Sequence, residues 1–264
     1  MRRREFIKLI ASGAAAWPVL ATFAAFVALV GGAIAAEPVD LLLVLASDVS
    51  HSVDDAKFKL QRDGYVAAIS DSRVIEVIRS GPHGRIAICF VEWSGHEQQR
   101  VVIDWMLIDG TKAARDFASQ LDEAPRSFAM YTSISGGIDF AMAQLQRAPF
   151  HSERHTIDVS GDGTNNSGRS VIAARNDAVA QGVTINGLVI LSEQPPEHDP
   201  FHTHPVGGLD DYYRENVVGG PNSFVIVAEN FNAFGKAMLN KLIAEIADAD
   251  GRGGTRFADL RAWP

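Results

Sequence analysis

The chain has 264 residues, of which 47% are hydrophobic and 21% are charged, and its formal net charge is −8. This balance is that of a folded globular domain and excludes a largely disordered chain. No basic stretch runs through the body of the sequence, so its charge argues against a nucleic acid as partner. Its single cysteine, Cys89, lies in an apolar run and is expected in the core, since one cysteine forms no internal disulfide.

The N-terminal residues 1–36 predict an export leader. Three arginines at positions 2–4 precede a long apolar stretch, and Ala33-Ile34-Ala35 fits the small-residue pattern of a cleavage site. The segment 3–8, RREFIK, resembles the twin-arginine export motif.

The apolar part of the leader is longer than a usual signal peptide requires, and it suffices to span a bilayer, which takes about 20 residues. A cleaved signal peptide and a retained N-terminal anchor therefore both stay open. Either one places the folded part outside the cytoplasm, in the periplasm or the cell envelope. We assign residues 37–264 to one domain, because no linker rich in proline, serine or charge divides them.

Beyond the leader, apolar runs typical of buried strands alternate with segments of helical spacing. Strands are predicted over Val39–Ala46, Arg85–Trp93, Gln98–Ile108, Thr156–Ser160, Val183–Leu191 and Ser223–Ala228. Helices are predicted over 56–71, Thr111–Leu121 with Thr111 as its cap, Ser133–Gln146, Val171–Gln181, Asp210–Val217 and Phe231–Ala247. This alternation predicts an α/β fold with a mostly parallel, covered sheet, and the short link at 94–96 predicts one antiparallel hairpin within it.

Three polar clusters fall where predicted strands give way to helices. Asp48, Ser50 and Ser52 follow the first strand, Thr132 precedes a helix, and Asp162 follows a later strand. Ligands of open α/β sheets bind beyond the carboxyl ends of strands. Two carboxylates and three hydroxyls form an all-oxygen set, which suits Mg²⁺, Mn²⁺ or Ca²⁺ and leaves room for water or a partner's oxygen.

Each of these residues also has a purely structural explanation. Asp48 and Ser50 are good caps for the helix that follows them, and Thr132 is one for the next helix. Asp162 lies between two glycines and suits a turn. The coincidence of three clusters at strand-to-helix junctions favours a site over these separate explanations.

In this order along the chain, the residues resemble the metal-ion-dependent adhesion site of von Willebrand factor A-type domains. That motif is Asp-x-Ser-x-Ser, then a threonine, then an aspartate, and the resemblance extends from about residue 39 to residue 247. The stretches 157–163, 165–166 and 212–217 are similar to a bacterial branch of that superfamily whose function is unknown.

The resemblance implies a Rossmann-like, doubly wound sheet of about six strands with helices on both faces. It implies a divalent cation, for which we expect Mg²⁺, with Mn²⁺ and Ca²⁺ as alternatives. Ser50, Ser52 and Thr132 would approach the ion directly or through water, and Asp48 and Asp162 would bind it or hold its waters. An open position would take an Asp or Glu carboxylate of a protein or peptide partner, which is binding without turnover.

Two other functions stay open. One is a scaffold domain with a vestigial site, and the other is a metal-dependent hydrolase, which would need a general base near the metal. His51 is the general base that the sequence suggests there. Against an enzyme, no Gly-x-Ser-x-Gly elbow, phosphate loop or dinucleotide fingerprint is found.

A second cluster lies in the proline-rich segment 193–205. It contains His198, Asp199, His202 and His204. Their spacing fits no metal motif that we can name, so a solvated loop is the expectation and a second, transition-metal site is the alternative.

Overall fold

The computed structural model describes residues 36–127, 131–191 and 200–247. The predicted leader, including its cleavage site, lies outside these residues. Within them, no helix combines the length and the apolar character needed to cross a bilayer.

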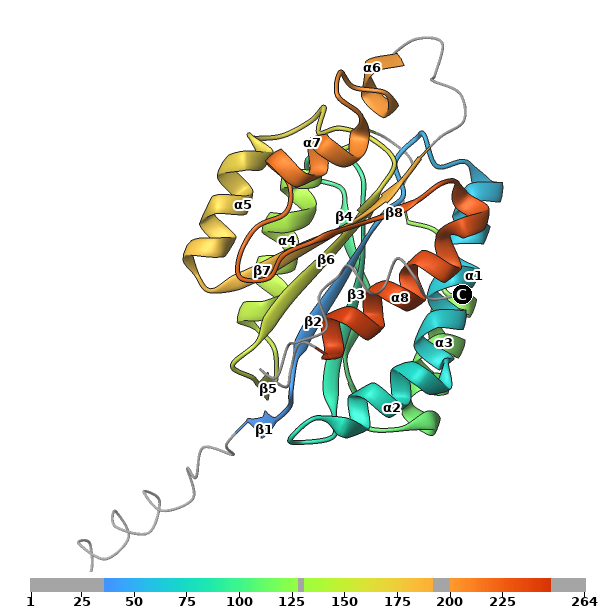
Figure 1. Cartoon of the computed structure of the whole chain (residues 1–264), viewed down its shortest axis with the longest axis vertical. Helices are drawn as coiled ribbons and strands as arrows, with labels where there is room; N and C mark the ends of the chain where they lie inside the picture. Colours follow the sequence, from blue (N-terminus) through green and yellow to red (C-terminus); the bar gives the residue numbers. More distant parts are fainter. Residues whose placement is uncertain (1–35, 128–130, 192–199, 248–264) are drawn as a thin grey trace, which may run out of the picture. The chain divides into compact units, whose positions relative to one another are not determined.

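A six-stranded sheet forms the centre of the described domain (Figure 1). Its strands are β2 (Leu42–Asp48), β3 (Ile86–Trp93), β4 (Gln99–Ile108), β6 (His155–Gly161), β7 (Val183–Ile190) and β8 (Val225–Ala228). Their order is β4-β3-β2-β6-β7-β8, and only β4, at one edge, runs antiparallel to its neighbour. Two short strands, β1 (Glu37–Pro38) and β5 (Phe150–His151), pair with each other. The predicted α/β sheet with one antiparallel edge strand is confirmed.

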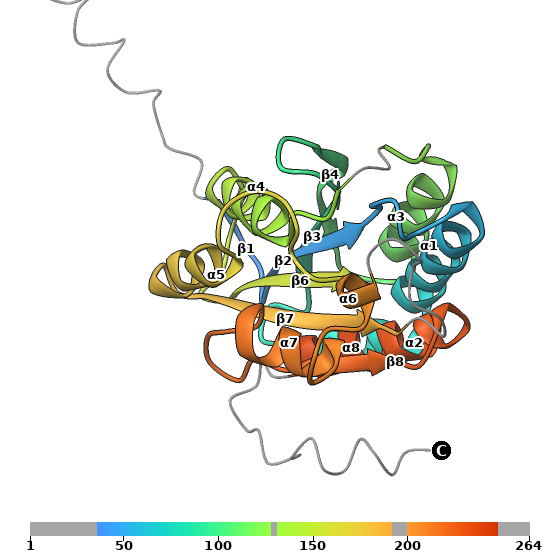
Figure 2. The ribbon, with the colours of Figure 1, turned by 90° about the horizontal axis from the view of Figure 1, so that it is seen from above.

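Helices cover both faces of this sheet (Figures 1 and 2). One face carries α1 (Asp55–Ser70), α2 (Ser72–Ser80), α3 (Thr111–Glu123) and α8 (Phe234–Ala247), which follows the 3₁₀ turn η1 (Phe231–Ala233). The other face carries α4 (Ile134–Gln146), α5 (Val171–Ala180) and α7 (Leu209–Asn216). The short α6 (Pro200–Thr203) precedes α7.

The central strand β2 is buried on both sides because it lies between β3 and β6. Successive side chains of a strand point to opposite faces. Leu43 and Leu45 accordingly join the core under α1 and α8, whereas Val44 and Ala46 join the core under α4 and α5. Cys89 of β3 is fully buried and free, as its apolar surroundings predicted.

The structure contains one helix that was not predicted, and it contradicts one predicted cap. The helix α2 was not predicted, because Asp71 ends α1 and at once caps α2 by accepting the backbone N–H of Arg73 at 2.9 Å. Because Asp71 is both the last cap of α1 and the first cap of α2, no loop residues separate the two helices in the sequence. Thr111 is the first residue of α3 and not its cap, which is Gly110, without a side-chain hydrogen bond.

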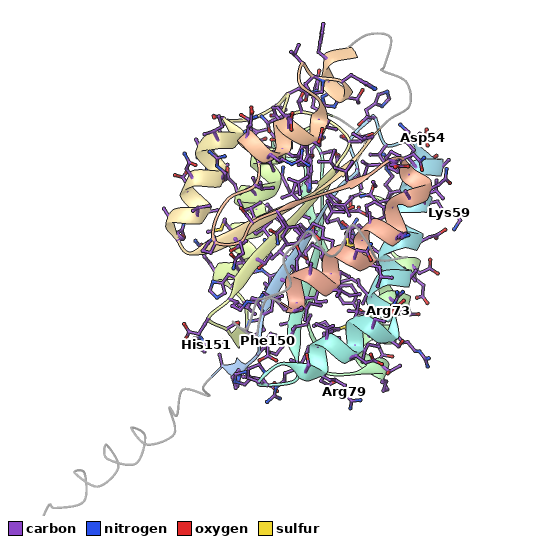
Figure 3. All side chains as sticks on the ribbon, in the orientation of Figure 1. Asp54, Lys59, Arg73, Arg79, Phe150 and His151 are labelled. Carbon is purple, nitrogen blue, oxygen red and sulfur yellow. The ribbon has the colours of Figure 1, made fainter. Side chains whose placement is uncertain are left out.

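The connections place a topological switch point between β2 and β6. The chain leaves β2 toward β3 on one side and later builds β6, β7 and β8 on the other. Asp54, just before α1, marks the end of the sheet where β2 ends, and Phe150 and His151 mark the opposite end (Figure 3). At such switch points the connections leave a crevice beyond the strand ends, where ligands of α/β sheets bind.

Candidate metal centre

The loop after β2 brings three candidate ligands together. The carboxylate of Asp48, the last residue of β2, accepts the backbone N–H of Ser50 at 2.7 Å. The hydroxyl oxygens of Ser50 and Ser52 lie 3.2 Å apart. Asp54 caps α1 by accepting the N–H of Lys57 at 2.9 Å, so neither Asp48 nor Ser50 serves as the cap of this helix.

Asp162, directly after β6, meets this loop across the switch point. Its Oδ1 accepts the hydroxyl of Ser52 at 2.5 Å, over a separation of 110 residues. Hydrogen bonds therefore link four of the five candidates, Asp48, Ser50, Ser52 and Asp162, into one cluster.

Thr132 is held beside this cluster by the segment after β6. Its backbone N–H donates to Asn166 Oδ1, and its carbonyl accepts the N–H of Asn166, each at 2.9 Å. Ser133 caps α4 by accepting the N–H of Gly136 at 3.2 Å, so Thr132 is not the cap. The Thr132 hydroxyl instead lies 3.1 Å from Nε2 of His202, whose charge influences Asp162. Thr132 and Asp162 thus have His202 as a common neighbour.

The two carboxylates of the cluster are buried and poorly compensated. Asp48 and Asp162 are both 0% exposed, and Oδ2 of each has no hydrogen-bond partner among the described residues. Burial and repulsion by Asp162 raise the pKa of Asp48 to about 8. Burial also raises the pKa of Asp162, against the opposing effects of the Ser52 hydroxyl, Lys57 and His202. The Nζ of Lys57 is 3.9 Å from Asp162 and is occupied by the carbonyl of Ser52 at 2.7 Å.

These features fit a divalent cation. A buried carboxylate oxygen without a partner is costly, and a bound cation supplies the missing charge and the missing contact. Among the described residues, no group of three or more His, Cys, Asp or Glu side chains has a metal-binding arrangement. A cation here would therefore need the serine and threonine hydroxyls as well as the two carboxylates.

Sequence reasoning missed His202. This residue was assigned to a solvated loop or a second metal site, and His51 was taken as the imidazole nearest the metal. In the structure His202 is 7% exposed and contacts Thr132, whereas His51 is exposed. His198 and Asp199 lie outside the described residues, and His204 is exposed. No local signal distinguishes His202 from His204, because only the path of the chain before α7 decides which one turns inward.

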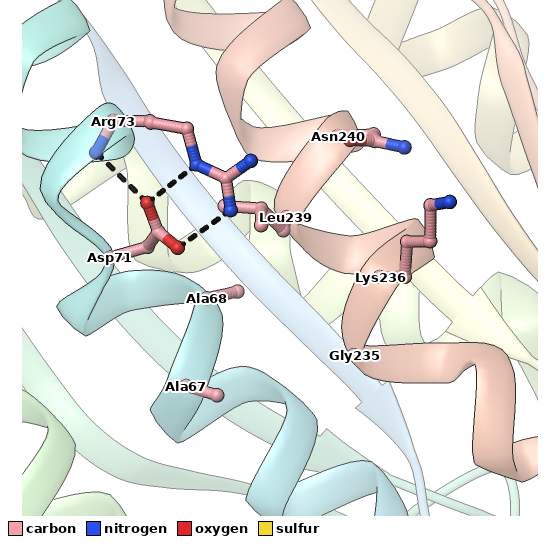
Figure 4. Close-up of a pocket in the computed structure, with 8 residues that line it drawn as sticks. All are labelled: Ala67, Ala68, Asp71, Arg73, Gly235, Lys236, Leu239 and Asn240. Carbon is pink, nitrogen blue, oxygen red and sulfur yellow. Dashed lines mark hydrogen bonds and ion pairs between the residues drawn. The ribbon is translucent and has the colours of Figure 1, made fainter. Parts of the chain in front are cut away.

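A groove between the helices lies elsewhere, on the face formed by α1, α2 and α8 (Figure 4). Small side chains such as Ala67 and Ala68 line it, together with the ion pair of Asp71 and Arg73 at 2.9 Å. It contains none of the candidate ligands.

A comparison with known protein families assigns the chain to one of them. Residues 38–250 match the model of a family described as "Protein of unknown function (DUF1194)". The chain belongs to this family. The match spans all the described strands of the DUF1194 chain that build the six-stranded sheet, and all five candidate ligands.

Solved structures of low identity share the fold of the DUF1194 chain. They include proximal thread matrix protein 1 from the mussel byssus with a zinc-occupied MIDAS motif, the metal-ion-dependent adhesion site (TM-score 0.53, 15% identity, covering 81% of this chain and 47% of that chain). The pilus adhesin SpaC from Lactobacillus rhamnosus GG has TM-score 0.56 and 12% identity, covering 80% and 31%. A von Willebrand factor type A protein from Catenulispora acidiphila has TM-score 0.52 and 14% identity, covering 81% and 43%.

The DUF1194 chain thus has the von Willebrand factor A-type fold that its sequence resembles. It spans less than half the length of these three structures.

Proposed function

We propose that this protein is an exported, metal-dependent binding module. A divalent cation, which we expect to be Mg²⁺, is held by Asp48, Ser50, Ser52, Thr132 and Asp162. The cation in turn holds a carboxylate of a protein or peptide partner.

One observation carries this proposal: two fully buried carboxylates share a cluster with serine hydroxyls, and one oxygen of each lacks a hydrogen bond among the described residues. Ions buried without compensation cost several kcal/mol. A cation bound between Asp48 and Asp162 offsets this cost and relieves the repulsion that raises the pKa of Asp48.

The donor set supports a hard ion. Oxygen ligands with only two carboxylates suit Mg²⁺, which keeps part of its water shell. The mussel matrix protein has zinc at the corresponding type of motif, which supports a divalent cation and leaves its identity to be measured.

Two exposed aromatic residues support a protein as partner. Tyr131 is 64% exposed and precedes Thr132, and Phe201 is 67% exposed and precedes His202. Each is the chain neighbour of a residue of the Thr132–His202 contact. Exposed aromatic side chains are common energetic anchors of protein interfaces. An adhesin and a matrix protein among the structures with this fold agree with a binding role rather than catalysis.

Export is the part of the proposal that rests on sequence alone. The basic and apolar leader at 1–36 supports delivery to the periplasm or cell envelope, either cleaved or as an anchor.

Calorimetric titration with Mg²⁺ and Mn²⁺ tests the metal centre. The wild-type protein should bind one ion, and Asp48→Ala should abolish the binding because it removes a buried carboxylate of the cluster. Asp54→Asn is the matched control: it removes one charge of the same loop and keeps an oxygen to cap α1. Equal binding of these ions by wild type and Asp48→Ala would show that the proposed metal site is wrong.

The partner is tested in a second step. Cross-linked envelope proteins should be captured by the wild-type domain in Mg²⁺, and capture should be lost with chelator and with Asp48→Ala. Capture that persists under both conditions would show that the metal does not hold the partner.

A further inference from the structure

We propose that His202 is a sixth residue of the metal centre, where it positions the hydroxyl of Thr132 for the cation. This inference rests on the proposed metal site and adds a residue from outside its motif. It starts from the 3.1 Å contact between Nε2 of His202 and Oγ1 of Thr132, which joins residues 70 positions apart.

The segment after Asp162 holds His202 in place. The backbone N–H of Thr164 donates to the carbonyl of His202 at 2.9 Å, and the hydroxyl of Thr164 lies 3.4 Å from Nδ1 of the ring. Both ring nitrogens of His202 thus have a neighbour, and both neighbours belong to segments of the metal centre.

Gly163 makes room for the ring. A Cβ atom at this position would lie 2.2 Å from Nε2 of His202, which is far inside van der Waals contact. The absence of a side chain between Asp162 and Thr164 is therefore what lets the imidazole reach Thr132.

The contact orients a ligand. A threonine hydroxyl that binds a cation turns a lone pair to the ion and must direct its hydrogen elsewhere. Nε2 of His202 accepts that hydrogen when the ring proton sits on Nδ1, where the Thr164 hydroxyl can accept it. Mutation of a residue that hydrogen-bonds to a metal ligand commonly lowers metal affinity 10–100-fold.

The neighbouring histidine provides the contrast. His204 is exposed, and its Nδ1 lies 2.8 Å from the hydroxyl of Thr203, next to it in the chain. It belongs to the same segment as His202, but in the described part of the chain no hydrogen bond or ion pair joins it to the five candidate ligands.

Titration with Mn²⁺, followed by the electron paramagnetic resonance signal of the free ion, measures this role. His202→Leu should weaken binding by about 10-fold or more. His202→Gln should recover most of the affinity, because its amide oxygen can accept the Thr132 hydroxyl, and His204→Gln should bind like wild type. Thermal unfolding of each variant, without metal, reports whether the fold is kept, and Gly163→Ala, described below, carries the test if the leucine variant does not fold.

A double-mutant cycle with Thr132→Val separates positioning from a general structural effect. If His202 acts through the Thr132 hydroxyl, His202→Leu should cost little further affinity once that hydroxyl is gone. An equal loss in both backgrounds would overturn the proposal. Gly163→Ala, which pushes the ring away, should weaken Mn²⁺ binding like His202→Leu, whereas Gly110→Ala, with open space around its Cβ, should not.

The test distinguishes this inference from the proposed function. Equal Mn²⁺ binding by wild type and Asp48→Ala would overturn both. Binding that is lost in Asp48→Ala but unchanged in His202→Leu and His202→Gln would overturn the role of His202 and leave the metal centre intact.

Discussion

Two carboxylates four positions apart on the same segment show opposite ways of burying a negative charge. Asp158 lies within β6 and Asp162 directly after it, and both are 0% exposed. Lys241 of α8, itself fully buried, places its Nζ 2.8 Å from Asp158. In the described part of the chain, Asp162 pairs with Lys57. The Nζ of Lys57 lies 3.9 Å from Oδ2 of Asp162, and the lysine side chain is partly exposed.

The difference separates a structural cluster from the proposed binding site. Lys241 also pairs with Glu245, whose carboxylate accepts Asn186 at 2.9 Å, so Asp158 has a fully buried cation of the chain in direct contact. Asp162 and Asp48 share their surroundings with hydroxyls, with the partly exposed Lys57 and with His202. A buried charge has to be paired or bound to a metal, and the pair at the end of the sheet is the one that an external cation can complete.

Removal of Lys241 should have the largest effect. Lys241→Met leaves Asp158 and Glu245 buried without their cation, which should lower the free energy of unfolding by about 3–5 kcal/mol. Lys57→Met should cost less than about 1 kcal/mol, since its ion pair is long and partly exposed. Chemical denaturation without metal measures both, and similar losses would erase the contrast between the two clusters.

Bound metal should stabilise the protein. Asp162→Asn should abolish that stabilisation but should make the metal-free protein more stable than wild type. Mg²⁺ at about 100 times its Kd should raise the free energy of unfolding of wild type by about 2.7 kcal/mol. Asp162→Asn should lose this response, and without metal it should be more stable than wild type because repulsion with Asp48 is gone. Asp158→Asn should be less stable than wild type, since it leaves the buried Lys241 with one acid fewer.

A smaller effect concerns pH. The pKa of Asp48 rises from 3.8 to about 8 on folding, so the folded protein holds this proton more tightly than the unfolded chain does. The stability of the metal-free protein should therefore fall as the pH rises from about 4 to about 8. Asp48→Asn should flatten this fall, and so should saturating Mg²⁺, which takes the place of the proton. If the free energy of unfolding of the metal-free wild type and that of Asp48→Asn change with pH in parallel, the proposed role of the Asp48 proton is wrong.

The sequence by itself determined the alternation of strands and helices and the order of Asp48, Ser50, Ser52, Thr132 and Asp162 along the chain. Both depend on local physics. A strand buried on both faces is apolar over most of its length, as β2 is from Leu42 to Ala46, and polar residues begin at its end with Ser47 and Asp48. Helix boundaries were less predictable, because Asp71 fits the end of one helix and the start of the next equally well.

Only the tertiary structure decided which distant groups meet. The contact of His202 with Thr132, and that of Lys241 with Asp158, depend on how the segments before α7 and in α8 return to the sheet. Residues 70 positions apart carry no periodic pattern that records such a contact. Packing of the domain places one histidine against Thr132 and leaves its neighbour exposed, and it gives the buried Asp158 a lysine in direct contact while Oδ2 of Asp162 has no hydrogen bond among the described residues.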